Sequence, residues 1–350
     1  MRDVAIVGFA QSKHLAADTH RNEVEILMPV VAEAIERSGV DRKSIGFTCS
    51  GSCDYLIGAP FSFVQALDAV GAWPPIQESH VEMDAAWALY EAWVRLQHGD
   101  LDSALVYGFG KTSMGDVTEI MTLQLDPYYL APLWPDTVSL AALQARAYLE
   151  ASGKSERDTA EVAARSSRDA ASNRNAVRSG DKSADDVLAE SPVVSPLRPS
   201  DCPPVTDGAA AVILAAGDLV PRLTDRPVWI RGIAHNVEPH SIGTRDLAQS
   251  RSTRAAAEKA GVSTGKIDVA EVHAQYSHEE LILSDALGLT NGVTMNPSGG
   301  ALGANPVMAT GLIRVGEAAS RIASDGASRA VAHAAQGPCL QQNLVCVLEG

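Results

Sequence analysis

The stretch Thr206-Asp207-Gly208-Ala209-Ala210-Ala211-Val212-Ile213-Leu214 leads from a turn into a continuous apolar run. Asp-Gly is a turn signal, and an unbroken run of apolar residues is typical of a strand buried on both faces. The apolar residues 4–8 predict a second buried strand, and helical spacing over residues 24–38 predicts a helix that ends before Gly39. The recurring order of strand and helix predicts an α/β protein.

One arrangement occurs twice in the chain. A helix predicted at 84–96 precedes the apolar strand 103–108, and a helix predicted at 307–319 precedes the strand 328–334; a glycine loop follows each strand. This pattern predicts an internal duplication of an α/β unit. Chance is the alternative, because any α/β protein contains such units.

The predicted domain organisation follows from this repeat. Pro, Tyr and Trp cluster between 127 and 135, and two helical stretches follow, so residues from about 115 to 200 are expected to form an inserted helical region. We therefore expect a first half at 1–220, which contains this insertion, and a second half at 221–350.

Composition limits the classes of function. The chain has 350 residues, of which 46% are hydrophobic, and a formal net charge of -15, which disfavours nucleic acid as a partner. No stretch approaches the roughly 20 apolar residues of a membrane span, and the five cysteines contain no CxxC pair. The expected protein is cytoplasmic, with reduced thiols and no metal site.

Several segments, in their order along the chain, resemble the thiolase superfamily, in particular its sterol-carrier-protein and lipid-transfer-protein branch. The two most specific are the TDGAAA run at 206–211 and the NPSGG run at 296–300. The resemblance implies a five-layer αβαβα sandwich built from two similar βαβαβαββ halves. It also implies a dimer, for which we expect the strand 103–108 and its flanking helix to form the dimer layer, and a pocket for an acyl-coenzyme A thioester.

The chain departs from thiolases at the nucleophile. Thiolases place a reactive cysteine where the first-half helix begins, because a helix N-terminus favours the thiolate. The corresponding stretch here is Val81-Glu82-Met83-Asp84-Ala85-Ala86, which has no cysteine. Counting back from Gly99 puts the nucleophile position near Glu82, and Asp84 is expected to cap the helix.

A second departure is the histidine of the family's GHP motif, which Asn305 replaces in Gly303-Ala304-Asn305-Pro306. An asparagine can donate a hydrogen bond to a thioester oxygen, but it cannot carry protons as imidazole does. Asn305 is therefore a candidate donor, and a simple helix cap is the alternative.

The segment His273-Ala274-Gln275-Tyr276-Ser277 resembles the active-site histidine loop of the sterol-carrier branch. Tyr276 adds a phenol that could act as a general acid or base, with His273 and His278 as neighbours that could assist it. A packed aromatic is the alternative for Tyr276. Cys339 lies near the family's second cysteine and is either a displaced nucleophile or a buried small residue.

No permanently bound cofactor is expected, since coenzyme A would arrive as part of the substrate. Ser298 and Gly300 of the NPSGG run and Arg198 are the candidates for binding it. Lys111, Arg165 and Arg168 are further candidates for its phosphates.

Three functions stay open at this point. The first is retro-aldol cleavage of a β-hydroxyacyl-coenzyme A, since the resemblance includes steroid side-chain aldolases that lack the cysteine and work with a small OB-fold, zinc-ribbon partner. The second is a non-catalytic binding, lipid-transfer or scaffold subunit, in which the thiolase fold pairs with an active relative or a partner domain. In each case the expected assembly is a homodimer or a heterodimer of thiolase-fold chains. The third is a thiolase that uses a displaced cysteine.

Overall fold

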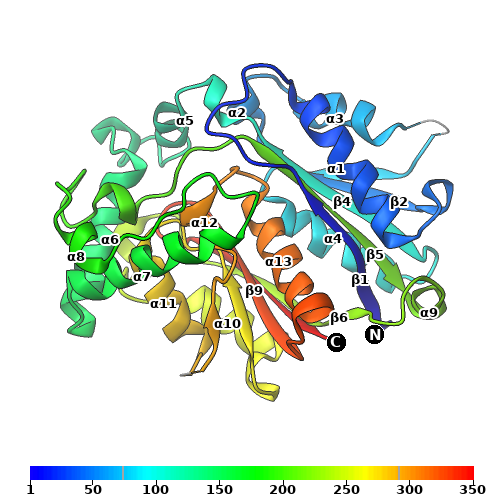
Figure 1. Cartoon of the computed structure of the whole chain (residues 1–350). Helices are drawn as coiled ribbons and strands as arrows, with labels where there is room; N and C mark the ends of the chain where they lie inside the picture. Colours follow the sequence, from blue (N-terminus) through cyan, green and yellow to red (C-terminus); the bar gives the residue numbers. More distant parts are fainter. Residues whose placement is uncertain (73–74, 291) are drawn as a thin grey trace.

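A computed structural model describes residues 1–72, 75–290 and 292–350. Their ten strands form one mixed sheet in the order β3-β2-β4-β5-β1-β6-β10-β9-β7-β8 (Figure 1). The strands are β1 Val4–Gln11, β2 Phe47–Gly51, β3 Glu78–Val81, β4 Ser103–Gly110, β5 Gly208–Ala216, β6 Val228–Val237, β7 Val269–Val272, β8 Thr294–Met295, β9 Arg329–Gln336 and β10 Gln342–Glu349.

Thirteen α-helices accompany them in the described parts of the chain. They are α1 Glu23–Ser38, α2 Asp54–Ile57, α3 Ser62–Val70, α4 Ala85–Gln97, α5 Val117–Leu123, α6 Thr137–Ser152, α7 Glu156–Asp169, α8 Ala184–Leu188, α9 Val220–Leu223, α10 Arg251–Ala260, α11 Ser277–Leu287, α12 Gly300–Gly303 and α13 Thr310–Asp325.

The two halves have the same topology. The first half runs in the order β3-β2-β4-β5-β1, and the second repeats this order with β8-β7-β9-β10-β6. The halves join where Ala5 and Ile6 of β1 pair with Trp229 and Val228 of β6. The predicted duplication thus corresponds to equivalent strands, since the segments 103–108 and 328–334 that the sequence matched fall on β4 and, except for Ser328, on β9.

Helices α4 and α13 form the central layer between the halves (Figure 1). One apolar core contains Leu89 of α4 and Leu312 of α13 together with residues of both halves of the sheet. A second core packs α1 and α3 on the outer face of the first half, and a third packs α10 and α11 on the outer face of the second half. This arrangement is the five-layer αβαβα sandwich that was predicted.

The predicted inserted helical region contains α5 to α8. Two of these helices, α6 and α7, pack against α11 of the second half, so a segment of the first half covers the second (Figure 1). The two helical stretches were expected at about 138–151 and 156–176. They correspond to α6 and α7, although α7 ends at Asp169 and a single 3-10 turn follows at Ala170–Ser172.

The prediction that residues 103–108 lie in a dimer layer is wrong. They belong to β4, which pairs with β2 on one side and β5 on the other, and every residue of β4 is buried. A strand with neighbours on both sides offers no free edge to a second chain. The edge strands of the sheet are β3 and β8.

Among the described residues, no helix is both long and apolar enough to cross a membrane. No group of His, Cys, Asp and Glu side chains within the same ranges has the arrangement of a metal site.

Candidate active site

His273 lies directly after β7, where it extends the hydrogen bonding of the sheet. Its backbone N–H donates to the carbonyl of His333 at 3.1 Å, and its Nδ1 accepts from the backbone N–H of Ala335 at 3.3 Å. Because Nδ1 accepts, the proton of a neutral ring is on Nε2. Nε2 has no hydrogen-bond partner in the described parts of the chain, so His273 is a buried donor without an acceptor.

The ring of His273 stays neutral at physiological pH. Burial, followed by the nearby His333 and Arg314, lowers the pKa of His273 to about 3, and the neighbouring side-chain amide of Asn305 works in the opposite direction. His273 can therefore donate a hydrogen bond from Nε2, but it does not carry a positive charge at pH 7.

Asn305 lies beside His273, in the segment between α12 and α13. Its backbone N–H donates to Thr206 Oγ1 at 3.0 Å, and its side-chain Oδ1 accepts from Thr310 Oγ1 at 2.8 Å. Within the described ranges, Nδ2 of Asn305 makes no hydrogen bond. The amide is therefore oriented by its oxygen, and its N–H donors are free for a ligand next to the donor of His273.

The backbone N–H groups at the start of α4 are bonded to other groups of the protein. Asp84 caps the helix by accepting from Ala86 N at 2.8 Å, and the backbone N–H of Ala85 donates to the carbonyl of Met308 at 2.9 Å. Met308 has a φ of 77°, a left-handed conformation that is strained for a non-glycine residue. The first N–H groups of α4 are thus already bonded inside the protein.

The helix start also corrects the assignment of the nucleophile position. The first helical residue is Ala85, three residues after Glu82, so the helix start at which the resemblance implies a cysteine has alanine. A methyl group on Gly108 would lie 2.5 Å from Cβ of Ala85, and Ala85 itself is fully buried. Glu82 lies outside the helix and accepts from Asp54 N at 2.6 Å.

Tyr276 and His278 lie at the start of α11, against α6. The Tyr276 ring packs on Ala141, Ala142, Ala145 and Leu197. Burial raises the pKa of the Tyr276 phenol, a hydrogen bond with Thr137 lowers it, and the nearby charges of Glu279 and Asp136 raise it further. The phenol is neutral at pH 7.

His278 is fully buried beside Gln144. Its Nε2 lies 3.2 Å from Gln144 Oε1, and burial lowers its pKa to about 3. The rings of Tyr276 and His278 are 6.1 Å apart between centroids, so the structure brings these two predicted residues together on one side of α6. His273 and Asn305 form the second pair of neighbouring predicted residues.

Cys339 packs against Leu125 and Leu140, and its thiol donates to the carbonyl of Leu140 at 3.4 Å. Burial raises the pKa of Cys339 to about 12, although Arg245 lowers it in part. A thiol with such a pKa holds almost no thiolate at pH 7. Its surroundings match the buried-residue alternative.

Ser298 and Gly300 belong to a buried hydrogen-bond network that also contains Glu271 and Arg314. Ser298 Oγ donates to Glu271 Oε2 at 2.7 Å, and Arg314 Nη1 donates to the same carboxylate oxygen at 2.6 Å. Gly300 N donates to Ser298 Oγ at 3.3 Å, and its φ of 61° favours glycine. These contacts shape the NPSGG turn.

The cations proposed for the coenzyme phosphates have partners inside the protein. Arg198 Nη2 donates to Glu156 Oε2 at 2.6 Å, Lys111 pairs with Asp207, and Arg165 pairs with Glu280. Arg168 reaches the carbonyl of Lys182 at 3.5 Å. Binding of a phosphate by any of these side chains would have to replace an existing contact.

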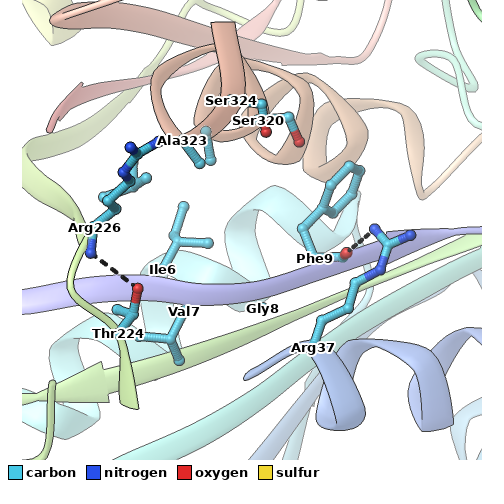
Figure 2. A pocket seen from close by; sticks show the side chains of 12 residues that line it. Ile6, Val7, Gly8, Phe9, Arg37, Thr224, Arg226, Ser320, Ala323 and Ser324 are labelled. Atoms are coloured by element: carbon cyan, nitrogen blue, oxygen red, sulfur yellow. Dashed lines mark hydrogen bonds between the residues drawn. The ribbon is translucent and has the colours of Figure 1, made fainter. Parts of the chain in front are cut away.

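Two cavities of about 310 Å³ lie elsewhere. Figure 2 shows the first, with Arg37 and Arg226 on opposite sides of a cleft against β1. Arg37 lies in the last turn of α1 and donates to the carbonyl of Phe9 at 2.9 Å. The second lies between α7 and residues 178–200. Neither is lined by a residue that the sequence predicted for the site.

Sequence reasoning missed three contributors to the site. Thr206 and Thr310 orient Asn305, and His333 lies beside His273. The TDGAAA run already contained Thr206, but its hydroxyl contact spans 99 residues of sequence and has no local signature.

Comparison with known proteins agrees with this architecture. No protein-family model matches the chain. It is 28% identical over 349 residues to an acetyl-CoA acetyltransferase of Methanocaldococcus jannaschii, covering 91% of this chain and 89% of that protein. It is 24% identical over 391 residues to human sterol carrier protein 2, covering 98% of this chain and 70% of the relative.

Two solved structures have the same fold. The Ltp2-ChsH2(DUF35) aldolase superposes with a TM-score of 0.83 at 16% identity, covering 99% of this chain and 98% of the other. A monomeric SCP2-thiolase like protein of Mycobacterium smegmatis gives 0.79 at 17% identity, covering 99% of this chain and 76% of the other.

The chain is therefore similar in sequence, over most of its length, to members of the thiolase superfamily, and it shares the fold of the solved thiolase-like structures. Its relatives include sterol carrier protein 2 and SCP2-thiolase like proteins, which confirms the branch that the sequence motifs indicated.

Proposed function

We propose that the protein cleaves a β-hydroxyacyl-coenzyme A by a retro-aldol reaction, without forming an acyl-enzyme. The observation that carries this proposal is the pairing of two free donors, His273 Nε2 and Asn305 Nδ2, near a helix start that has alanine in place of cysteine. Such donors stabilise negative charge on a thioester oxygen. They need no covalent bond to the substrate.

The proposed reaction balances without a further reactant. A base takes the proton of the β-hydroxyl, the C–O bond becomes a carbonyl, and the bond between the α and β carbons breaks. Its electron pair forms the enolate of the departing acyl-coenzyme A, whose oxygen accepts from His273 and Asn305. Protonation of the α carbon then completes the shorter thioester.

Tyr276 is the proposed proton acceptor, as the sequence suggested. Because burial and neighbouring carboxylates keep the phenol neutral at pH 7, only a small fraction is phenolate. The rate should then rise with pH as that fraction grows. His278 is proposed to act on the position of the phenol, since the two rings are neighbours.

The substrate and partner are proposed from the relatives. The Ltp2-ChsH2(DUF35) aldolase supports a carbon–carbon lyase that works with a second protein, and we expect an OB-fold partner here too. A bulky acyl group, such as a steroid side chain, is the proposed substrate. A homodimer, or a heterodimer with another thiolase-fold chain, is the expected assembly.

Two alternatives to the retro-aldol reaction are a thiolase that uses Cys339 and a non-catalytic subunit. A thiolase acting through Cys339 is disfavoured, because burial raises the pKa of that thiol to about 12. A non-catalytic subunit would bind coenzyme A esters or a partner chain but would not turn them over. The loss of both the cysteine and the GHP histidine is compatible with that function.

The test is single-turnover cleavage of a β-hydroxyacyl-coenzyme A with a polycyclic acyl group, with the partner protein present. We expect a carbonyl product and a shortened acyl-coenzyme A in equal amounts. Tight binding with no product from the complete complex would favour the non-catalytic subunit.

A further inference from the structure

Asp84 joins the two central helices at their first turns. Its Oδ1 accepts from Ala86 N at 2.8 Å and from Leu312 N at 3.2 Å, and its Oδ2 accepts from Gly311 N at 2.8 Å. An ordinary N-cap bonds only the helix that it begins. This carboxylate caps α4 and α13 together, although 227 residues separate it from Gly311.

The close approach depends on a glycine. A methyl group on Gly311 would lie 2.5 Å from Oδ1 of Asp84 and 2.5 Å from Cβ of Ala334. Such distances do not occur between real atoms of these kinds, so a side chain at 311 would push the carboxylate or α13 away. Asp84 and Gly311 therefore act as one structural unit.

The same turn of α13 holds Asn305. Thr310, next to Gly311, donates from its hydroxyl to Asn305 Oδ1 at 2.8 Å and lies 3.1 Å from the carbonyl of Pro306. The position of α13 thus determines where Thr310 holds the amide oxygen, and the amide oxygen determines where Nδ2 points. Asp84 lies at the start of this chain of contacts.

Asp84 also changes what the helix ends can do. The N-terminus of each helix carries partial positive charge, which favours an anion. Here the N-termini of α4 and α13 both face the carboxylate of Asp84, a side chain that is only 1% exposed. A substrate oxyanion would therefore be stabilised by the side-chain donors of His273 and Asn305, and not by the N-termini of α4 and α13.

We propose that Asp84 is a positioning residue that fixes Asn305 by tying the first turn of α13 to that of α4. The inference rests on the proposed function, in which Asn305 Nδ2 binds the thioester oxygen. Asp84 itself does not touch the substrate, since three backbone N–H groups occupy its two oxygens.

The test is a double-mutant cycle between Asp84→Asn and Asn305→Ala. An asparagine at 84 has one acceptor oxygen, and its NH₂ group would face a backbone N–H, so at least one of the two helices loses its cap. We measure single-turnover cleavage, and the Kd of an acetyl-coenzyme A analogue with CH₂ in place of sulfur, which keeps the carbonyl oxygen.

We expect Asp84→Asn to weaken binding of the analogue and slow cleavage by about 10-fold each, since a displaced donor loses part of its effect on the oxyanion. In the Asn305→Ala background the same change should cost less than about twofold, because the group it positions is gone. A structural role for Asp84 would not produce this dependence on Asn305.

Thr310→Val provides a second variant in case Asp84→Asn does not fold. It removes the hydroxyl that holds Asn305 and keeps the shape of the side chain. Thr310→Val should therefore weaken binding of the analogue and slow cleavage by about 10-fold each, and it should have no further effect on either in the Asn305→Ala background. Asn22→Ala is the matched control, because Asn22 caps the distant helix α1. It should lower the thermal midpoint and leave both measurements unchanged.

The outcomes separate the two proposals. Losses from Asp84→Asn or Thr310→Val that multiply in full with Asn305→Ala, in an active protein, overturn the positioning inference alone. A wild-type complex that neither binds the analogue nor cleaves the substrate overturns the proposed function as well.

Discussion

The two halves of the molecule share one topology, but they make different contributions where their central helices begin. At the start of α4, the first half presents Ala85 with small glycines around it, and its one polar group, Asp84, is fully bonded. In the loop before α13, the second half presents Asn305 and, directly after β7, His273, each with a free donor. A duplicated fold can thus keep its packing in one half and its polar chemistry in the other.

The strongest way to break this comparison is to remove the donors of the second half. We expect Asn305→Ala to slow single-turnover cleavage by on the order of 10²-fold, the usual scale for one oxyanion donor. The helix-cap alternative for Asn305 is wrong, because α13 begins at Thr310 and its N-cap is Ala309. If Asn305 had only a structural role through its hydrogen bonds with Thr206 and Thr310, the variant would lose about 1 kcal/mol of stability and keep its turnover. Thermal unfolding measured beside the kinetics separates the two.

Tyr276 tests whether the proton acceptor also belongs to the second half. We expect Tyr276→Phe to keep the fold and the Kd for the ester while slowing cleavage by about 10²-fold. Because the phenol has a raised pKa, the wild-type rate should rise with pH above 7, and the variant should lose this rise. A Phe variant with full activity would remove Tyr276 from the mechanism.

Acid sensitivity sharpens the comparison, because three of the four fully buried histidines with lowered pKa values lie in the second half. The pKa of His278 falls from 6.5 to about 3, so the unfolded chain binds its proton first and stability is lost as pH falls below 6.5. This histidine contributes a loss on the order of 1–2 kcal/mol at pH 5.

His278→Gln, which keeps an amide beside Gln144, should reduce that loss. The measurement is the free energy of unfolding at pH 7 and pH 5 for both proteins. Glu279 has the opposite effect on stability: burial raises its pKa to about 7, so its protonation stabilises the folded protein as the pH falls. Because the wild type and the variant both contain Glu279, its effect cancels in the comparison. An equal fall in the two proteins would mean that His278 is not buried in its neutral form.

The sequence predicted the architecture better than the site. Apolar runs and glycine turns identified β1, β5 and the repeated helix–strand unit, because these signals are local. The double cap of Asp84 depends on a residue 227 positions away, and the free donor of His273 depends on Ala335, so neither has a local pattern. The strand at 103–108 was placed at an interface, although its continuous apolar run is typical of the interior strand that it is.

The central claim is that this chain handles acyl thioesters with donors of its second half and without covalent capture. Intact-mass analysis during turnover of a β-hydroxyacyl-coenzyme A, with the partner present, tests it most directly. We predict cleavage products and no acyl adduct on the protein, because Ala85 occupies the nucleophile position and the buried thiol of Cys339 is protonated. An acyl adduct that forms and decays at the rate of product release, on Cys339 or any other residue, would contradict the account.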